Sequence, residues 1–319
     1  MSEIFFSEAA AAAVLKKSVV TIGNFDGMHI GHQSIFAKAV DEAKARDARA
    51  VALTFEPHPE AFFRPDSAPV RLAPPPHKFD IMGQYGVDAI VVLSFDKTLA
   101  GQSPEEFVEG ILVESLKASH VVVGEDFRFG KKRAGDTDSL KELGAPHSMT
   151  ATAAEWVRWN DEVVSSTRIR KAIAAGEMEK VRGMLGRPYR LFGNVGHGDA
   201  RGRTLGYPTA NMNVEDMAIP LNGIYATTLA TKGGTHWRAA TSIGVRPTFG
   251  GGERTVETFV LDERIDDDLD LYGDDVELDI YKRLRDELKF DGPEELVAQM
   301  DRDIEDVRAF FDDEGFDGG

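Results

Sequence analysis

Residues 19–33, which read VVTIGNFDGMHIGHQ, constrain the fold of this chain more than any other stretch. A short β-branched run enters a turn rich in glycine, and apolar residues then recur at helical spacing at Phe36, Ala39, Val40 and Ala43. This pattern predicts a strand, a tight loop and the start of a helix. The first amide groups of a helix have no partner within it and its dipole favours negative charge, so the loop is a candidate phosphate site.

Two histidines stand at the expected helix entrance. His29 and His32 are three residues apart, so both imidazoles can face one bound group. Gly23, Gly27 and Gly31 let the backbone approach a ligand closely. Two imidazole donors suit the charge that develops on a phosphoryl group during transfer. Taken alone, the HxGH pattern fits a plain turn before an ordinary helix equally well.

Length and charge favour a two-domain protein that acts on small molecules. The chain has 319 residues, enough for two domains with their own cores, and no cysteine, which excludes thiol nucleophiles, disulfides and thiolate metal sites. Its net charge of -17 argues against a general binder of nucleic acids or anionic membranes, because either would need a basic face. No run approaches the roughly 18 to 20 apolar residues of a membrane span and no secretion signal is visible, so we expect a cytoplasmic protein.

Apolar strands alternate with helical patterns in the first part of the chain. The strand candidates are residues 19–22, 50–55, 89–93 and 120–124, and residues 104–116 show a helical pattern. Strands that are apolar throughout indicate a parallel sheet covered on both faces, so we expect a Rossmann-like α/β domain. Ligands of such sheets bind beyond the carboxyl ends of the strands, where this chain carries the loops GNFDGMHIGH, FEPHP and GEDFRFG.

The loop GEDFRFG is a candidate contact for a planar ligand. Phe127 and Phe129 alternate with Arg128, so both rings would lie on one side of an extended segment. An aromatic ligand could stack there, although on this segment alone two phenylalanines favour a place in the core.

The segment SSTRIRKAI begins a helix with hydroxyl and basic side chains. Ser166 or Thr167 can cap the first turn, and capping alone would explain the hydroxyls. Arg168, Arg170 and Lys171 bring positive charge to a helix end that disfavours cations unless an anion is present. The segment is therefore a second candidate for contact with phosphates.

After residue 186 the pattern changes to short strands and glycine turns. The strand candidates are residues 189–196, 223–231, 237–243, 255–261 and 276–284. Such a series predicts a small antiparallel barrel, followed by a closing helix from Pro293 to about Phe311. We expect Asp291 and Glu294 to form its capping box. We interpret its apolar stripe as core: Leu296, Met300, Ile304, Val307 and Phe311.

The loop GHGDARGRTLGYPTANM is the most informative part of this second region. Its glycines, Gly202 among them, make it supple enough to wrap a phosphate chain, and Arg203 adds positive charge. Thr209 and Asn211 project from one side of an extended segment, with oxygens suited to a hard cation such as Mg²⁺. A plain long loop also fits this composition. Farther on, Glu257 interrupts the run VETFVL, where alternation makes a solvent-facing strand position the default.

These segments together resemble one family, the bacterial bifunctional riboflavin kinases and FMN adenylyltransferases. GNFDGMHIGH is similar to the nucleotidylyltransferase signature in which HxGH contacts the phosphates of a nucleoside triphosphate, and Ser166, Thr167 and Arg170 match the STxxR element that accompanies it. The loop ending in PTAN resembles that of riboflavin kinases, whose threonine and asparagine bind magnesium and phosphates. Glu257 falls on the glutamate of the family's VExxxLD pattern, which acts as general base on the ribityl hydroxyl.

The resemblance implies a role for each matching residue. Residues 1–186 would form the adenylyltransferase domain and residues 187–319 the kinase domain. The implied catalytic residues are His29, His32, Arg170 and Glu257. The implied nucleotide contacts are Gly23, Asn24, Phe25, Asp26, Gly27, Gly31, Ser166, Thr167, Gly202, Arg203, Thr209 and Asn211, the last two also as metal ligands. Candidate flavin contacts are Phe62, Asp126, Phe127 and Phe129, with Asp126 standing where some relatives have asparagine.

By this resemblance the protein phosphorylates riboflavin with ATP and Mg²⁺ to FMN, then adenylylates FMN with a second ATP to FAD and pyrophosphate. Its partners would be small molecules, with no nucleic acid or membrane, and it would be a monomer or a weak homo-oligomer. One alternative is a nucleotidylyltransferase for another phosphorylated substrate with a regulatory barrel, against which the PTAN loop and Glu257 argue. The other is a non-catalytic flavin-binding protein, which would have no need of HxGH.

Overall fold

The structure, a computed structural model, describes residues 2–196, 209–231, 234, 236–246, 253–261 and 271–316. Its internal contacts divide the chain into two compact units. The first consists of Met1–Arg71 and Pro75–Ser166, and the second of Leu72–Pro74 and Thr167–Gly319. The predicted domain boundary at residues 186/187 stays a prediction.

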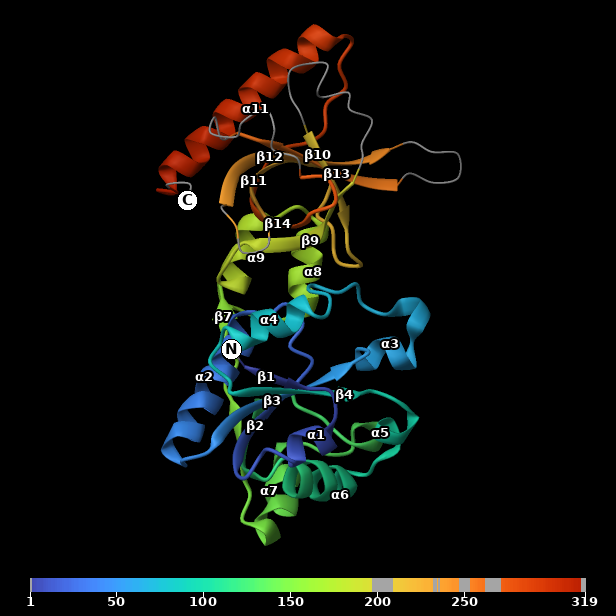
Figure 1. The fold of residues 1–319 in the computed structure, drawn as a ribbon, viewed down its shortest axis with the longest axis vertical. Coiled ribbons are helices and arrows are strands. Elements are labelled where there is room, and N and C mark those ends of the chain that lie inside the picture. The colour runs from blue at the N-terminus through green and yellow to red at the C-terminus, as the bar shows by residue number, and fades with distance from the viewer. Residues whose placement is uncertain are drawn as a thin grey trace. The chain divides into compact units, whose positions relative to one another are not determined.

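The first unit contains a six-stranded sheet in the order β1-β4-β3-β2-β5-β6, in which every neighbouring pair is parallel (Figure 1). The predicted Rossmann-like sheet is therefore confirmed, whereas β1 and β6 were not foreseen. The strands are β1 (Glu3–Phe5), β2 (Ser18–Ile22), β3 (Arg49–Glu56), β4 (Ala89–Ser94), β5 (Ala118–Gly124) and β6 (Thr150–Ala154).

Helices cover the sheet because its strands are apolar on both faces. One core cluster joins alternate residues of the strands to α1, the π-helical segment η2 and α7, while α2 packs against β2, β3 and β5. The helical segments are α1 (Glu8–Ala12), α2 (Ile30–Ala45), α3 (Pro59–Phe63), η1 (Pro65–Ser67), α4 (His77–Gly83), α5 (Lys97–Gly101), α6 (Pro104–Glu106), η2 (Phe107–Ser115), η3 (Lys131–Arg133), α7 (Thr137–Gly144) and η4 (Ala145–His147). A two-stranded ribbon, β7 (Arg158–Trp159) with β8 (Glu162–Val163), precedes α8 (Ser166–Ala174).

The direction in which successive strands are added to the sheet reverses between β2 and β5. From β2 the chain moves through β3 to β4 on one side and returns to place β5 on the other side of β2. In open α/β sheets ligands bind at such a switch point, beyond the carboxyl ends of the strands. The loops that follow β2 and β5 are the predicted GNFDGMHIGH and GEDFRFG.

The second unit contains a closed six-stranded barrel in the order β10-β13-β12-β11-β14-β9, with all neighbours antiparallel (Figure 1). This confirms the predicted barrel with its C-terminal helix, and adds β10, which was expected only as an extended segment. The elements are α9 (Met178–Leu185), β9 (Tyr189–Gly196), β10 (Thr209–Val214), β11 (Gly223–Thr231), β12 (His236–Arg246), β13 (Glu253–Val260), β14 (Asp275–Arg285) and α11 (Pro293–Asp313).

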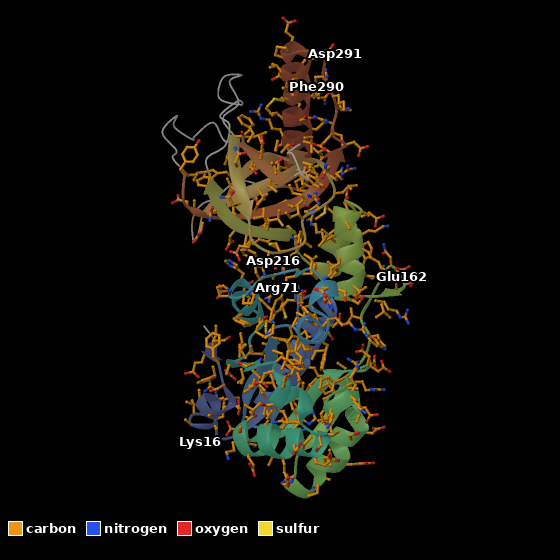
Figure 2. The ribbon with its side chains drawn as sticks, turned by 90° about the vertical axis from the view of Figure 1, so that its right-hand side faces the viewer. Lys16, Arg71, Glu162, Asp216, Phe290 and Asp291 are labelled. Atoms are coloured by element: carbon orange, nitrogen blue, oxygen red, sulfur yellow. The ribbon has the colours of Figure 1, made fainter. Side chains whose placement is uncertain are left out.

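The helix α11 follows Phe290 and Asp291 and differs from its prediction in two details (Figure 2). Its N-cap is Gly292 without a side-chain cap, and the amide of Asp291 donates to Glu295 at 3.3 Å, so the predicted capping box with Glu294 is wrong. Proline in the first turn supplies a preset backbone angle instead. Only the C-terminal part of the apolar stripe is core, because Val307 and Phe311 have no exposed surface. The other three residues, Leu296, Met300 and Ile304, line a cavity.

A buried ion pair holds α11 on the barrel. The Arg285 guanidinium donates Nε to Oδ1 of Asp303 at 2.7 Å and Nη2 to Oδ2 at 2.6 Å. The Asp303 side chain is 7 % exposed, and Gln299 donates a third bond to its Oδ1 at 3.0 Å. Two parallel bonds fix the direction of the guanidinium as well as its distance.

Replacing Asp303 with alanine should therefore destabilise the barrel unit. We expect Asp303→Ala to lower its free energy of unfolding by about 3 kcal/mol, because Arg285, whose side chain is only 20% exposed, would lose its charged partner. Urea unfolding followed by peptide-resolved hydrogen exchange measures this. Asp306→Ala, an exposed position on the same helix, is the matched control and should change stability by about 0.5 kcal/mol or less. Equal effects of the two substitutions would contradict the assignment.

Candidate functional site

The two histidines of the first unit form one stacked pair at the start of α2. His29 is the N-cap residue, and its Nδ1 accepts a hydrogen bond from the backbone amide of His32 at 3.2 Å. The two rings stack with centroids 3.6 Å apart and planes 19° apart. Since Nδ1 of His29 is an acceptor, the ring hydrogen of the neutral imidazole lies on Nε2, which is left to donate to a bound group.

The loop before the pair is held in a sparsely populated backbone conformation. Phe25 and Met28 have φ of 52° and 42°, although neither is glycine. Such residues cost on the order of 1–3 kcal/mol each and cluster at functional sites. Gly31 is needed for space, because a Cβ there would lie 3.1 Å from the His29 ring. The loop is thus shaped around its histidines.

Burial keeps both histidines neutral. His29 is 6 % exposed, and burial lowers its pKa to about 4. Burial, followed by the charges of His29 and Lys78, lowers the pKa of His32 well below its usual value. The Nδ1 atom of His32 is buried and has no hydrogen-bond partner in the described part of the chain. The lowered pKa values favour neutral rings at neutral pH, which can form hydrogen bonds but carry no charge.

The other predicted residues of this unit lie in separate surroundings. Phe129 is 7 % exposed and stacks on Phe127 at a centroid distance of 5.6 Å within the core cluster. Phe62 makes edge contacts with Phe63 and Phe95, of which Phe63 is largely exposed. Their contact with a flavin stays a prediction, as does that of Asp126.

The STxxR segment contacts the histidine loop through its first residue. The Ser166 hydroxyl donates to the backbone carbonyl of Asp26 at 2.9 Å, which ties the start of α8 to the loop. Thr167 and Arg170 belong to the second unit, so their part in this site stays a prediction.

In the second unit, strand pairing brings three predicted residues together. Asn211 on β10 is the register partner of Glu257 on β13, and Thr209 is the partner of Phe259. Side chains two apart on a strand share a face, so Thr209 and Asn211 lie on the same face as Glu257. On its other side Glu257 pairs with Ser242 of β12. Glu257 is half-buried and has polar register partners, Asn211 and Ser242, on both neighbouring strands.

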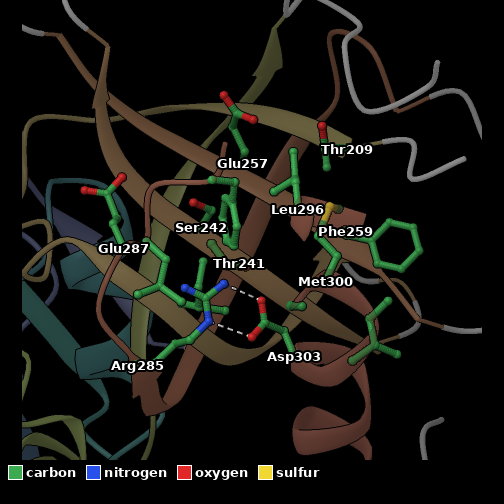
Figure 3. Close-up of a pocket in the computed structure, with 15 residues that line it drawn as sticks. Thr209, Thr241, Ser242, Glu257, Phe259, Arg285, Glu287, Leu296, Met300 and Asp303 are labelled. Carbon is green, nitrogen blue, oxygen red and sulfur yellow. Dashed lines mark hydrogen bonds and ion pairs between the residues drawn. The ribbon is translucent and has the colours of Figure 1, made fainter. Parts of the chain in front are cut away.

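A cavity of about 350 Å³ opens beside this group, between the barrel and α11. Figure 3 shows Glu257 and Thr209 on one side of the cavity and the Arg285–Asp303 ion pair on the other. The lining residues are Thr209, Ile224, Ala240, Thr241, Ser242, Glu257, Phe259, Arg285, Glu287, Leu288, Phe290, Leu296, Met300, Asp303 and Ile304. Eight of these fifteen residues are apolar and seven are polar or charged, so the cavity offers both kinds of contact, as sites for small ligands do.

Sequence reasoning missed several of these residues. Ser242, Arg285, Glu287 and Asp303 line the cavity but were not singled out as contacts. Arg285 and Glu287 lie in the segment RLRDELKF, which resembles the family's C-terminal pattern, whereas Ser242 and Asp303 lie outside it and carried no sequence signal. The predicted Gly202 and Arg203 lie outside the described residues.

Two different protein families match the N-terminal and the C-terminal part of the chain. A family model described as FAD synthetase matches residues 11–168, and one described as riboflavin kinase matches residues 185–311. The curated Bifunctional riboflavin kinase/FMN adenylyltransferase of Pseudomonas fluorescens is 38% identical over 292 residues, which cover 91% of this chain and 92% of the relative. The protein of the same name from Listeria monocytogenes is 38% identical over 296 residues, 92% of each chain.

A solved structure has a similar fold over nearly the whole chain. It is named Macrolide-efflux Protein from Streptococcus pneumoniae, and matches 96% of this chain and 98% of its own with a TM-score of 0.84 and 29% identity. Among the described residues of this chain, no helix is long and apolar enough to cross a membrane.

The buried histidines should make the first unit sensitive to acid. The unfolded chain binds protons on these rings below about pH 6.5, whereas folded His29 stays neutral down to about pH 4, so stability is lost as the pH falls between these values. Between about pH 7.5 and pH 5 the loss from His29 is about 2 kcal/mol. His29→Asn should remove this part of the dependence, as measured by hydrogen exchange of first-unit peptides.

The matched control is His147→Asn, at an exposed histidine of the same unit, which should keep the wild-type dependence. An His29→Asn variant as acid-sensitive as the wild type would show that His29 is not held neutral by burial.

Proposed function

The chain belongs to the family of bifunctional riboflavin kinase/FMN adenylyltransferases, and we propose that its two parts divide the two reactions between them. The protein makes FAD from riboflavin in two steps. Residues 187–319 phosphorylate riboflavin to FMN, and residues 1–186 join FMN to the adenylyl group of ATP, with release of pyrophosphate. The order along the chain is that of the two family models.

The pairing of Asn211 with Glu257 beside the cavity is the observation that carries the kinase proposal. Glu257 accepts the proton of the ribityl hydroxyl as that oxygen attacks the γ-phosphorus of ATP, and the bond from that phosphorus to the bridging oxygen breaks so that ADP leaves. A base positioned on the same face as the phosphate-binding residues needs no further movement to reach the attacking oxygen. Ser242, its register partner on β12, is placed to orient the carboxylate or the hydroxyl.

The donor set on β10 fits a magnesium ion. Thr209 and Asn211 offer a hydroxyl and an amide oxygen, which are hard ligands of the kind Mg²⁺ takes together with substrate phosphates. When bound, the ion offsets negative charge on the transferred phosphoryl group. We assign Gly202 and Arg203 to the phosphates of the same ATP, on the basis of their place in the PTAN loop.

The cavity is proposed as the site of the flavin ring. Its volume of about 350 Å³ lies within the range for small-ligand sites, and Leu296, Met300 and Ile304 of α11 give it an apolar wall. A planar ring held there would direct its ribityl chain toward Glu257 and Thr209, which lie on the side of the cavity away from the Arg285–Asp303 pair. This also explains why these three residues of the stripe are left out of the core.

In the first part of the chain the histidine pair is proposed to stabilise charge during adenylyl transfer. The FMN phosphate attacks the α-phosphorus of ATP, so no side-chain nucleophile is required. His29 and His32 donate hydrogen bonds to the phosphate oxygens that gain charge. Arg170 is proposed to neutralise the leaving pyrophosphate, and the surrounding loop residues and the STxxR hydroxyls to bind ATP.

We also propose the contacts of FMN, the cellular location of the enzyme and its oligomeric state. The isoalloxazine ring of FMN would contact Phe62, Asp126, Phe127 and Phe129, of which Phe62 borders the exposed Phe63. We propose a cytoplasmic enzyme that acts as a monomer or weak homo-oligomer on small molecules, without nucleic acid. Its net charge of -17 supports the last point.

Substitutions in the two sites should separate the two activities. Glu257→Gln should lower FMN formation about 10²- to 10⁴-fold, because the general base is lost, and leave FAD formation from supplied FMN unchanged. His29→Ala should do the opposite, with FMN accumulating and FAD formation reduced about 10²- to 10³-fold. Chromatography of the flavins over time measures both, and each variant is the folding control of the other. Loss of both activities in one folded variant would contradict the division.

A further inference from the structure

The first unit contains a buried lysine that the proposed reaction does not use. Lys78 of α4 is 4 % exposed, and its ammonium donates to Oε1 of Glu56 at 2.8 Å and approaches the carbonyl oxygen of Phe55 at 3.5 Å. Burying an ammonium ion costs several kcal/mol unless partners compensate for the lost water. Hydrophobic residues would fill this place at less cost, so a role for the charge itself is indicated.

Its partner Glu56 stands at the carboxyl end of β3 and binds two cations. Lys78 contacts one carboxylate oxygen, and Arg71 donates to the other at 3.1 Å. The Arg71 side chain, labelled in Figure 2, is 30% exposed, whereas that of Lys78 is 5% exposed. The lysine is thus the inner cation and the arginine the outer one, and the three groups together carry one net positive charge.

The same ammonium acts on the loop that carries the histidines. Burial lowers the pKa of Lys78, and the charges of Glu56 and then of Asp26, which is 6 % exposed, oppose that shift. Burial also lowers the pKa of His32, and the charge of Lys78 adds to that lowering. Two hydrogen bonds join this loop to β3: the amide of Gly23 donates to Leu53 at 3.1 Å, and the Thr54 hydroxyl donates to Asn24 at 3.3 Å. Lys78 itself contacts the carboxyl end of β3, through Phe55 and Glu56, and this is the strand to which the histidine loop is bonded.

We propose that Lys78 is a positioning residue for adenylyl transfer, whose ammonium, bonded to Glu56 and attracted by Asp26, fixes the histidine loop against the end of β3. The inference rests on the function proposed for the first part of the chain. Without the ammonium, two half-buried or buried carboxylates repel each other across the loop. The loop then shifts, and His32 takes up a proton more readily.

The test uses three variants of the full chain, with riboflavin phosphorylation in the same molecule as an internal control. Lys78→Met should lower kcat for FMN adenylylation about tenfold to a hundredfold, because a displacement of about 1 Å has effects of this size. The KM for riboflavin and the kinase kcat should not change. Lys78→Arg, which keeps the charge, should recover most of the activity. Arg71→Met, at the outer cation, should stay within about threefold of the wild type.

The pH profile of adenylylation distinguishes positioning from a loss of stability. The charged and titratable groups that act on His32 are His29 and Lys78, and those that act on Lys78 are Glu56, Asp26 and Arg71. Lys78→Met removes a positive charge and should move the acid limb of kcat to higher pH. Glu56→Gln removes a negative charge and should move it to lower pH. The FMN phosphate titrates equally in every variant and cannot produce opposite shifts.

Two results would overturn the inference. One is a Lys78→Met enzyme with the wild-type kcat and acid limb, and the other is a shift of the limb in the same direction for Lys78→Met and Glu56→Gln. If hydrogen exchange shows that the first unit of Lys78→Met is unfolded, the kcat and the acid limb of Lys78→Arg and Glu56→Gln test the inference instead. A wild-type protein that makes no FAD from FMN refutes the proposed function instead, and ring titration of His32 by NMR then tests the placement of Lys78 without turnover.

Discussion

Strand pairing between distant parts of the chain decides which side chains meet in both units. In the barrel, the register of β10 and β13 sets Asn211 opposite Glu257. A slip of one residue would turn every side chain of the strand to the other face and separate Glu257 from Thr209 and Asn211. In the parallel sheet, pairing of β2 with both β3 and β5 brings the loops that follow these strands to one edge. In both units, the pairing of strands brings the candidate site residues together.

Burial then determines the chemistry that each site can perform. His29 is buried and its pKa is lowered to about 4, and the bond from the His32 amide to His29 leaves a ring hydrogen of His29 on Nε2. Neutral donors that are already oriented stabilise new charge without any reorganisation of water. The kinase part uses burial differently, because a buried Arg285–Asp303 pair holds α11 in place and so shapes the cavity.

The sequence predicted what depends on local pattern and missed what depends on packing. The turn and helix around His29, the strands of the barrel and the face shared by Thr209 and Asn211 follow from spacing alone. The strand β1 has three residues at the edge of the sheet, too few for a periodic signal, and β10 is too polar to read as a strand. A lysine in a short helix reads as a solvent-exposed side chain, and only tertiary contacts show that Lys78 is buried.

The central claim is that one chain performs both transfers, and isotope labelling of ATP tests it most directly. Riboflavin and Mg²⁺ would be incubated with the protein and ATP labelled at either the γ- or the α-phosphorus, and the FAD cleaved at its pyrophosphate bond. The account predicts that the FMN fragment carries the γ-label and the AMP fragment the α-label. FAD without the γ-label in its FMN half, or no FAD at all, would contradict it.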